Sequence, residues 1–554
     1  MYFDNKIFIG KSNDEKVYLY PGKANRHGLI AGATGTGKTV TLKVLAESFS
    51  AAGVPVFLAD IKGDLAGMCE CGVENDNLRG RVEKFGLNEC GWTYQSFPTE
   101  FWDIYEEKGL PLRTTVTEMG PLILAQVLGL NEVQTDILTV VFKIADDNGL
   151  LLIDTKDLKA MLQYVGENAK EFELDYGNIA RQSVSAIVRA IVALESEGGD
   201  KFFGEPALSI GDWFTRDASG KGTIQVLDCQ KLIHNPTMYA SFMLWLMSEL
   251  FETLPEVGDP ALPKMIFFFD EAHLLFKNAS KELLNKVDQV VKLIRSKGVG
   301  IYFITQNPKD IPDGILSQLG NKIQHGLNAY TPAEQKAARA AADSFRENPE
   351  FDTFDTLITL GTGEALVSVL DEKGVPTIVK KTKILPPQSL MGAIEDEPRM
   401  NVVNNSFIYP RYKNYFDRDS AYEFLTRRSR QLEDEVAAAK AEKERLAAEE
   451  KAEKERLKAE EKAEKERIKA EEKAEKERIK AEEKALREAE KEAAAKQKQI
   501  KKATKNLANS AAGTIGRELG NTLGKTLGGT FGKKVGGNVG ATLARGILGT
   551  LFNL

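Results

Sequence analysis

The stretch that decides the fold of this chain lies at residues 32–39 and reads Gly32-Ala33-Thr34-Gly35-Thr36-Gly37-Lys38-Thr39. It has the spacing G-x-x-x-x-G-K-[ST] of a phosphate-binding loop, or P-loop. The apolar residues 27–31 precede it and are expected to form a buried strand, and residues 40–52 have helical composition. This strand–loop–helix context favours a nucleotide site over the alternative, a chance glycine-rich turn.

Each part of residues 32–39 has a chemical role in such a site. The glycines let backbone N–H groups curl around an anion, and the N-terminus of the following helix adds the positive end of its dipole. Lys38 is expected to reach the β- and γ-phosphates, and the Thr39 hydroxyl is expected to bind Mg²⁺. The sequence therefore predicts ATP and Mg²⁺ as cofactors.

Residues 54–60 form a continuous apolar run that ends in an acid, Asp60, and Asp64 follows shortly after. Such a run is typical of a parallel strand that is buried on both faces. In open α/β sheets the C-terminal ends of the strands hold the ligand. Asp60 and Asp64 could therefore approach the nucleotide or its water, and a role as a capped turn is the alternative.

A second apolar run, residues 264–269, ends in the two carboxylates Asp270 and Glu271. This is the Walker B form, in which the first acid holds Mg²⁺ through water and the second polarises the attacking water. We therefore expect Asp270 to act on the metal and Glu271 to act as the general base. A plain acidic strand end is the alternative, and the upstream P-loop argues against it.

Residues 300–305 predict the next buried strand, and the amide of Gln306 closes it. A glutamine at this place can hydrogen-bond the γ-phosphate. It can therefore sense hydrolysis, because that hydrogen bond is lost when the γ-phosphate leaves. The signal gains weight from its position after the two Walker motifs. The expected catalytic residues are thus Lys38, Glu271 and Gln306.

The chain divides into five expected parts. An ATPase core is formed by residues 1–67 and 222–386, and residues 68–221 form a mainly helical insertion without a catalytic signature. The remaining parts are a linker with short helices at 387–432, a long charged helix at 433–506 and a glycine-rich tail at 507–554.

The long charged helix has an eleven-residue repeat that places one large apolar residue in each repeat: Leu446, Leu457, Ile468 and Ile479. An eleven-residue period favours a right-handed supercoil if the stripe pairs with another helix. Pairs such as Glu450 with Lys454 also support an isolated helix in water. A solvated single helix and a coiled coil both stay open, and either would reach roughly 110 Å.

In the tail, glycine recurs every fourth residue from Gly516 to Gly540, alongside an apolar residue with the same step. Seven glycines in a helix cost about 6–7 kcal/mol relative to alanine, so a lone helix would not form in water. This glycine-zipper pattern lets helix backbones approach closely and predicts contact with a partner helix, a second copy or a membrane surface. A disordered glycine-rich tail is the alternative.

Composition narrows the functional classes. The chain has 554 residues, 42% of them hydrophobic, and a formal net charge of −7, which argues against a generally basic surface for nucleic acid. The spacing of its four cysteines does not suggest zinc and indicates a reduced, cytosolic compartment. We see neither a signal peptide nor an apolar stretch of about 18 residues, so a cytoplasmic protein is expected, which the tail could hold at the inner membrane.

With these motifs in place, the sequence resembles the HerA/FtsK superfamily of P-loop motors, and more narrowly its YjgR-like, HerA-helicase-like branch. The resemblance implies an α/β fold with a RecA-like P-loop ATPase sheet, and assembly of identical subunits into a ring, typically a hexamer, with DNA in the pore. It covers roughly residues 5–430 and the extreme C-terminus, and the segments that carry it are 29–39, 58–65, 269–273, 305–308, 319–325, 417–423 and 545–549.

The sequence departs from the family pattern in two ways. HerA relatives carry an N-terminal β-barrel domain, for which the about 25 residues before the P-loop leave no room. Family motors also place an arginine on the strand after the glutamine, where it reaches the γ-phosphate of the neighbouring subunit. Here Lys322 occupies that place, and lysine lacks the guanidinium fork. The candidate substitutes are Arg295, Arg339 and Arg346.

Three functions stay open at this point. The favoured one is an ATP-driven ring motor that acts on DNA. The second keeps the ATPase but gives it another cargo, with the tail docked to a membrane or a partner. The third is a nucleotide switch with little turnover, suggested by the missing arginine. The string Asp-Glu-Ala-His at 270–273 is also found in DEAH-type helicases, but a single interrupted sheet argues against that class.

Overall fold

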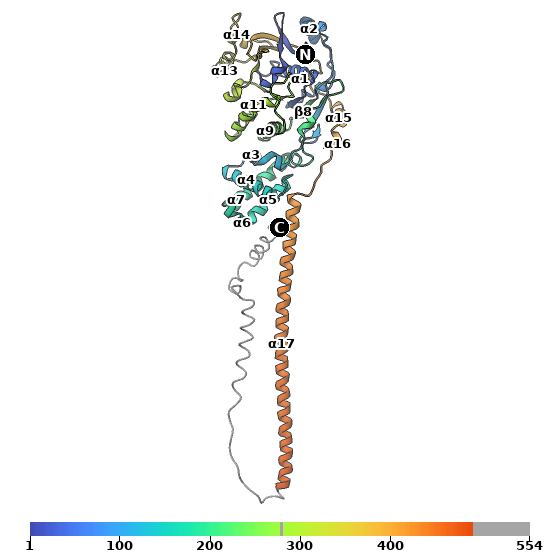
Figure 1. Ribbon diagram of the computed structural model, residues 1–554, viewed down its shortest axis with the longest axis vertical. Coiled ribbons are helices and arrows are strands. Elements are labelled where there is room, and N and C mark those ends of the chain that lie inside the picture. Colours follow the sequence, from blue (N-terminus) through green and yellow to red (C-terminus); the bar gives the residue numbers. More distant parts are fainter. Residues whose placement is uncertain (278–280, 491–554) are drawn as a thin grey trace. The chain divides into compact units, whose positions relative to one another are not determined.

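A computed structural model describes residues 1–277 and 281–490 (Figure 1). The chain divides into two units, residues 1–425 and a second unit that begins at Thr426. The glycine-zipper tail predicted at 507–554 lies outside the described residues, as does the end of the long charged helix.

A thirteen-stranded sheet runs through the described part of the first unit. Its parallel part extends to one edge and contains, in spatial order, β11 (Asn321–His325), β4 (Gly28–Ala31), β10 (Val299–Thr305), β9 (Met265–Phe269), β5 (Val56–Asp60), β8 (Ile224–Asp228), β6 (Thr99–Asp103) and β7 (Leu110–Pro111). An antiparallel edge continues from β11 through β12 (Glu364–Ser368), β13 (Lys380–Ile384), β2 (Lys6–Ser12) and β1 (Tyr2–Phe3), with β3 (Glu15–Leu19) paired to β2.

Strand β9 explains why the apolar runs of the sequence become central strands. All five of its residues are buried. The ring of Phe268 packs against Phe49 of α1 (Lys38–Ala51), with 6.5 Å between ring centroids, whereas Phe267 lies on the other face, 6.3 Å from Trp213. A strand that is covered on both faces needs apolar residues at every position. Its sequence is therefore a continuous apolar run and not an alternation of apolar and polar residues.

The strand order places the predicted motifs at one edge of the sheet. Strand β4, which leads into residues 32–39, pairs with β10 on one side and with β11 on the other, and β10 pairs in turn with β9. Because all four strands are parallel, the loop after β4, the acids after β9 and the amide after β10 all follow C-terminal strand ends. This is the edge at which α/β sheets bind ligands.

The stretch 68–221 is largely helical and also extends the sheet through β6 and β7. Figure 1 shows its helices α3–α7 gathered together, at the end of the first unit away from α2 (Asp76–Phe85) and α14 (Thr353–Thr359). These helices are α3 (Val116–Val127), α4 (Glu132–Asp147), α5 (Thr155–Glu167), α6 (Ala169–Tyr176) and α7 (Arg181–Leu194).

Residues 387–420 cross the first unit as a connecting segment that contains α15 (Asp396–Asn404) and α16 (Tyr409–Tyr412). At its start, the buried carboxylate of Glu47 in α1 accepts hydrogen bonds from the backbone N–H groups of Gln388 and Ser389. Farther along, Arg399 forms an ion pair of 2.8 Å with Asp228 at the end of β8, and both side chains are buried. The segment therefore joins the helix after the P-loop to the far side of the sheet.

The long helix α17 (Ala421–Glu490) begins at Ala421 and not near residue 433, so it includes the end of the expected linker. In the second unit, the side chains of Leu446, Leu457 and Ile468 are 53%, 55% and 45% exposed. Ion pairs one helical turn apart, such as that of 2.5 Å between Lys454 and Glu450, support the helix along this stretch. Both the single helix and the coiled coil thus stay open. Among the described residues, we find no helix that is long and apolar enough to span a membrane.

Candidate active site

The loop between β4 and α1 has a backbone that only glycine adopts readily at several positions. Gly32, Gly35 and Gly37 have φ angles of 152°, 79° and 113°. A Cβ atom on Gly32 would also lie 2.5 Å from Cβ of His325, and one on Gly37 would lie 3.2 Å from the backbone nitrogen of Gly363. Gly32 and Gly37 are therefore required both for conformation and for space, and Gly35 is required for conformation alone.

Neighbouring segments hold this loop in place. The backbone N–H of Gly32 donates to the carbonyl of Thr305 in β10 at 3.3 Å, and that of Ala33 donates to the carbonyl of Gly326 after β11 at 2.9 Å. The N–H groups in the first turn of α1, which begins at Lys38, have no acceptor within the helix. They are available to an anion at the helix N-terminus. Thr34 and Gly35, at the tip of the loop, are exposed.

Lys38 lies at the centre of the site. Its Nζ donates to the carbonyl oxygens of Gly32 at 2.6 Å and Ala33 at 3.1 Å. Burial lowers the pKa of Lys38, and the negative charges of Glu271 and Asp270 oppose that shift. The ammonium group therefore lies within the electrostatic field of both Walker B acids.

Asp270 follows β9 directly, and its carboxylate is held by the N–H of Glu271, which donates to Oδ1 at 2.8 Å. The backbone carbonyl of Asp270 accepts a hydrogen bond of 2.7 Å from the hydroxyl of Tyr239 on α9 (Pro236–Thr253). Burial raises the pKa of Asp270 to about 6, and the neighbouring Glu271 adds to the shift. A bound cation would favour the charged form of this carboxyl, as expected of a metal ligand.

Glu271 lies between two polar side chains. Gln306 Nε2 is 3.5 Å from Glu271 Oε2, and His273 Nδ1 is 3.3 Å from the same oxygen. Glu271 also has a positive φ of 45°, which is uncommon for a residue other than glycine. Such backbone strain tends to occur at functional sites. The structure thus brings Lys38, Glu271 and Gln306 together around one end of the P-loop, with Thr39 in the first turn of α1.

The sequence left two interpretations of Asp60 open, contact with the nucleotide and a capped turn. In the structure Asp60 caps a turn. Its two carboxylate oxygens accept the N–H groups of Gly63 at 2.7 Å and Leu65 at 3.1 Å. Burial raises its pKa to about 7, with a further contribution from Asp64. The carboxylate therefore closes the loop that follows β5.

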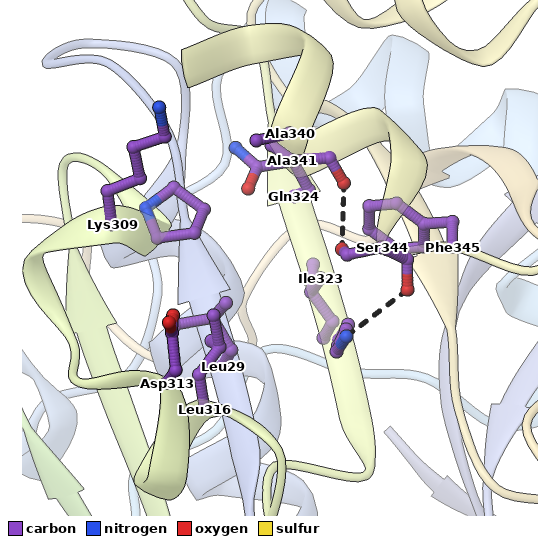
Figure 2. Close-up of a pocket in the computed structure, with 12 residues that line it drawn as sticks. Leu29, Lys309, Asp313, Leu316, Ile323, Gln324, Ala340, Ala341, Ser344 and Phe345 are labelled. Atoms are coloured by element: carbon purple, nitrogen blue, oxygen red, sulfur yellow. Dashed lines mark hydrogen bonds between the residues drawn. The ribbon is translucent and has the colours of Figure 1, made fainter. Parts of the chain in front are cut away.

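Lys322, the residue at the place of the family arginine, belongs to β11 and lines a pocket that Ala340 and Ala341 of α13 (Pro332–Asp343) also line. Figure 2 shows this pocket. Lys322 Nζ donates to the carbonyl of Ser344 at 3.2 Å, and burial lowers the pKa of this lysine. The pocket that Lys322 lines has a volume of about 190 Å³. Most of its lining side chains are apolar, and Lys309, Asp313 and Gln324 are among the polar ones. In Figure 2, the Gln324 amide lies between Lys309 and Ala340.

The three candidate substitutes for Lys322 have other contacts. Arg295 forms an ion pair with Asp259 at 3.2 Å, and Arg339 lies over the ring of Phe354, 4.3 Å from its centroid. Arg346 donates to the carbonyl of Pro376 at 3.3 Å. None of these contacts in the described structure involves the P-loop, so the four candidates for a residue acting on a neighbouring subunit are not gathered at Lys38.

His325 was not among the residues predicted for the site, although it packs directly against the P-loop. Its Nε2 lies 2.8 Å from Thr41 Oγ1 on α1, and its Nδ1 lies 2.9 Å from the backbone carbonyl of Glu364. Burial lowers its pKa to about 4, so the ring is neutral at physiological pH. One sequence signal could have identified His325 as a site residue. It is the last residue of a strand, and that strand lies next to the P-loop strand.

The order of strands, the loop with Lys38 and the two acids after β9 together define a class, the P-loop ATPases with a RecA-like sheet. The chain belongs to the family described as helicase HerA-like C-terminal, whose model matches residues 5–553. The resemblance to the HerA/FtsK superfamily is thereby confirmed, as are the α/β fold class and the assignment as an ATPase.

Several relatives have similar sequences. A DNA double-strand break repair helicase HerA from Sulfolobus acidocaldarius is 23% identical over 378 residues, 68% of each chain. The corresponding protein of Sulfurisphaera tokodaii is 24% identical over 396 residues, which cover 69% of this chain and 70% of the relative. A probable helicase from Methanocaldococcus jannaschii is 30% identical over 169 residues, 29% of this chain and 31% of the relative.

Two solved structures match part of the chain at low sequence identity. The plasmid coupling protein TrwB in complex with a non-hydrolysable ATP analogue matches with a TM-score of 0.47 and 14% identity, over 67% of this chain and 88% of that one. VirB4 of Thermoanaerobacter pseudethanolicus matches with a TM-score of 0.44 and 16% identity, over 69% and 96% of the two chains.

Proposed function

We propose that this chain is a Mg²⁺-dependent ATP-hydrolysing ring motor that translocates on DNA or remodels it. The observation that supports the chemistry best is the convergence of Lys38, Glu271 and Gln306 at one end of the P-loop. DNA as the cargo is supported by the HerA relatives, which are DNA double-strand break repair helicases.

In this proposal residues 32–39 bind the triphosphate, which replaces the loop carbonyls as the partner of Lys38 Nζ. Thr39 through its hydroxyl and Asp270 through its carboxylate, by way of water, would hold Mg²⁺, because oxygen ligands suit this ion. When bound, Mg²⁺ neutralises charge on the phosphates.

Glu271 takes a proton from the attacking water, and Gln306 positions that water and senses the γ-phosphate. The hydrogen bond between Gln306 Nε2 and Glu271 Oε2 is long, at 3.5 Å. Both groups can therefore exchange it for hydrogen bonds with the attacking water molecule. The hydrogen bond from Tyr239 to the Asp270 carbonyl steadies the end of β9 under both acids.

Assembly as a homo-oligomeric ring, a hexamer by family resemblance, would place a cation of one subunit at the γ-phosphate of the next. Lys322 is our first candidate, followed by Arg295, Arg339 and Arg346. To act in this way Lys322 would have to leave its hydrogen bond with Ser344. A lysine without the guanidinium fork would stabilise the transition state less than an arginine does.

A second candidate function keeps the ATPase and changes its cargo and site of action. Helix α17 then serves as a spacer, and the glycine-zipper tail docks the protein to a membrane or a partner helix. The strong exposure of the described part of α17 favours a spacer. In either case we place the protein in the cytoplasm, peripheral to the inner membrane in the second. The low-turnover switch is the third candidate, favoured by lysine at position 322.

The test is the ATPase rate of the full chain as a function of protein concentration, with and without double-stranded DNA. The proposal expects a specific activity that rises with concentration, because sites are completed between subunits, and that rises further with DNA. Lys38→Ala should abolish it, and Lys143→Ala, which changes an exposed lysine paired with Asp147 on α4, should leave it unchanged. A rate independent of DNA would favour the second candidate, and a negligible rate under all conditions would favour the switch.

A further inference from the structure

A cation from outside the predicted ATPase core lies beside the P-loop. Arg81 belongs to α2, and its Nη2 donates to the carbonyl of Ile384 at 2.9 Å. A Cβ atom on Gly363 would lie 2.8 Å from Arg81 Nη2 and 3.0 Å from Nη1. The guanidinium group therefore packs directly against the backbone of Gly363, which precedes β12.

Gly363 in turn contacts the P-loop. Its N–H donates to the carbonyl of Thr36 at 3.0 Å, and its backbone nitrogen and Cα would lie 3.2 and 3.3 Å from a Cβ atom on Gly37. Only the backbone of one glycine thus separates Arg81 from residues 36 and 37. A side chain at position 363 would displace the guanidinium group.

The side chain of Arg81 is partly buried. Among the described residues, no carboxylate oxygen lies within 4.0 Å of its guanidinium nitrogens. Burial lowers its pKa, opposed by the charge of Glu364, whose carboxylate forms an ion pair of 3.3 Å with Lys381. The buried Arg399, in contrast, has a carboxylate partner in Asp228. A cation is costly to bury without a counter-charge, so the site of Arg81 suits an anion.

The strand order indicates which way the terminal phosphate and the nucleoside end of a nucleotide bound at residues 32–39 would face. The acids Asp270 and Glu271 follow β9, on the β10 side of the P-loop strand β4, whereas Gly363 precedes β12 on the β11 side. A triphosphate whose terminal phosphate faces Glu271 must therefore leave the loop with its nucleoside end towards Gly363. Arg81 lies on that side.

We propose that Arg81 binds the nucleotide at its nucleoside end, through a hydrogen bond from the guanidinium group to an oxygen of the α-phosphate. This inference rests on the proposed binding of ATP by residues 32–39 and adds a specific contact to it. The contact is present in ATP and ADP alike, so Arg81 contributes to affinity and not to the hydrolytic step. It also makes α2, which precedes most of the helical insertion, a direct sensor of nucleotide occupancy.

The first test measures the binding of ADP with Mg²⁺ to the full chain by calorimetry, together with steady-state ATP hydrolysis. Arg81→Gln should raise the Kd of ADP and the KM of ATP by about ten- to hundredfold, the loss expected for a charge-assisted hydrogen bond, and leave kcat nearly unchanged. Arg79→Gln is the matched control, because Arg79 lies on the same helix, is exposed and pairs with Glu74. Its Kd should equal that of the unmodified chain.

The second test needs no variant. Phenylglyoxal modifies accessible arginines of the full chain, and mass spectrometry of peptides from its subsequent digestion follows each site. ADP should slow the modification of Arg81 and leave that of Arg79 unaffected. If ADP gives Arg81 no protection, or if Arg81→Gln lowers the melting temperature without raising the Kd, Arg81 merely anchors α2 to Ile384 and the assignment is overturned. Should Lys38→Ala also bind ADP normally, the failure lies instead with nucleotide binding at the P-loop.

Discussion

The amide of Gln306, at the end of β10, lies 3.5 Å from the carboxylate of Glu271, at the end of β9. The two residues are far apart in the sequence and meet because their strands are parallel neighbours. In the proposed function, this carboxylate and this amide would together hold the water molecule that attacks the terminal phosphate.

Glu271→Gln should bind ATP normally and lose turnover by about 10²-fold or more, because the amide cannot accept the proton of the attacking water. Rapid-quench measurement of phosphate release, together with ATP binding by filter retention, checks both parts. Glu256→Gln, which changes an exposed acid in the loop before β9, serves as the control. Turnover at the normal rate in Glu271→Gln would remove this residue from the role of base.

Gly32→Ala should destabilise the protein and prevent nucleotide binding. The added Cβ meets His325 at 2.5 Å, and the φ of 152° is unfavourable for alanine, which costs about 1–3 kcal/mol in strain alone. Thermal unfolding and ADP calorimetry measure the two effects. The control is Gly80→Ala, at an exposed helical position where a Cβ meets nothing within 4 Å. That change should stabilise the chain by about 0.5–1 kcal/mol.

Arg399→Ala should lower the free energy of unfolding by about 3–5 kcal/mol, because it leaves the buried carboxylate of Asp228 without its partner. Urea denaturation of the full chain measures this difference. Arg79→Ala removes an exposed partner of Glu74 and should leave the unfolding midpoint unchanged. A small effect of Arg399→Ala would mean that residues 387–420 are only loosely attached to the sheet.

The buried histidines make stability depend on pH. Burial lowers the pKa of His27 to about 4, whereas an unfolded histidine titrates near 6.5. Between these values the unfolded chain binds the extra proton, so this residue's contribution to stability falls as the pH drops from about 6.5 to about 4. His27→Asn, which suits the positive φ of 58°, should reduce that loss relative to the unmodified chain in urea titrations at several pH values. Equal slopes for both proteins would contradict the assignment.

Much of the fold follows from patterns that are local in sequence. Residues 32–39 and the apolar runs before Asp60, Asp270 and Gln306 predict strands, a phosphate loop and acids at strand ends, and the structure contains these elements. The charged repeat predicts a long helix from residue 433, whereas the structure begins this helix at Ala421. Helix boundaries depend on capping contacts, and here the N–H of Tyr422 in the first turn of α17 donates to the carboxylate of Asp157 on α5 at 2.8 Å.

By itself, the sequence determined that this protein is a P-loop ATPase, because phosphate binding requires glycine, lysine and threonine at fixed spacing along one continuous backbone. Only the tertiary structure decided that His325 supports the loop, that Lys322 points into a pocket away from it and that Arg81 lies beside Gly363. Those contacts join strands and helices that are distant along the chain. Their geometry depends on strand order and side-chain burial, which no short stretch of sequence encodes.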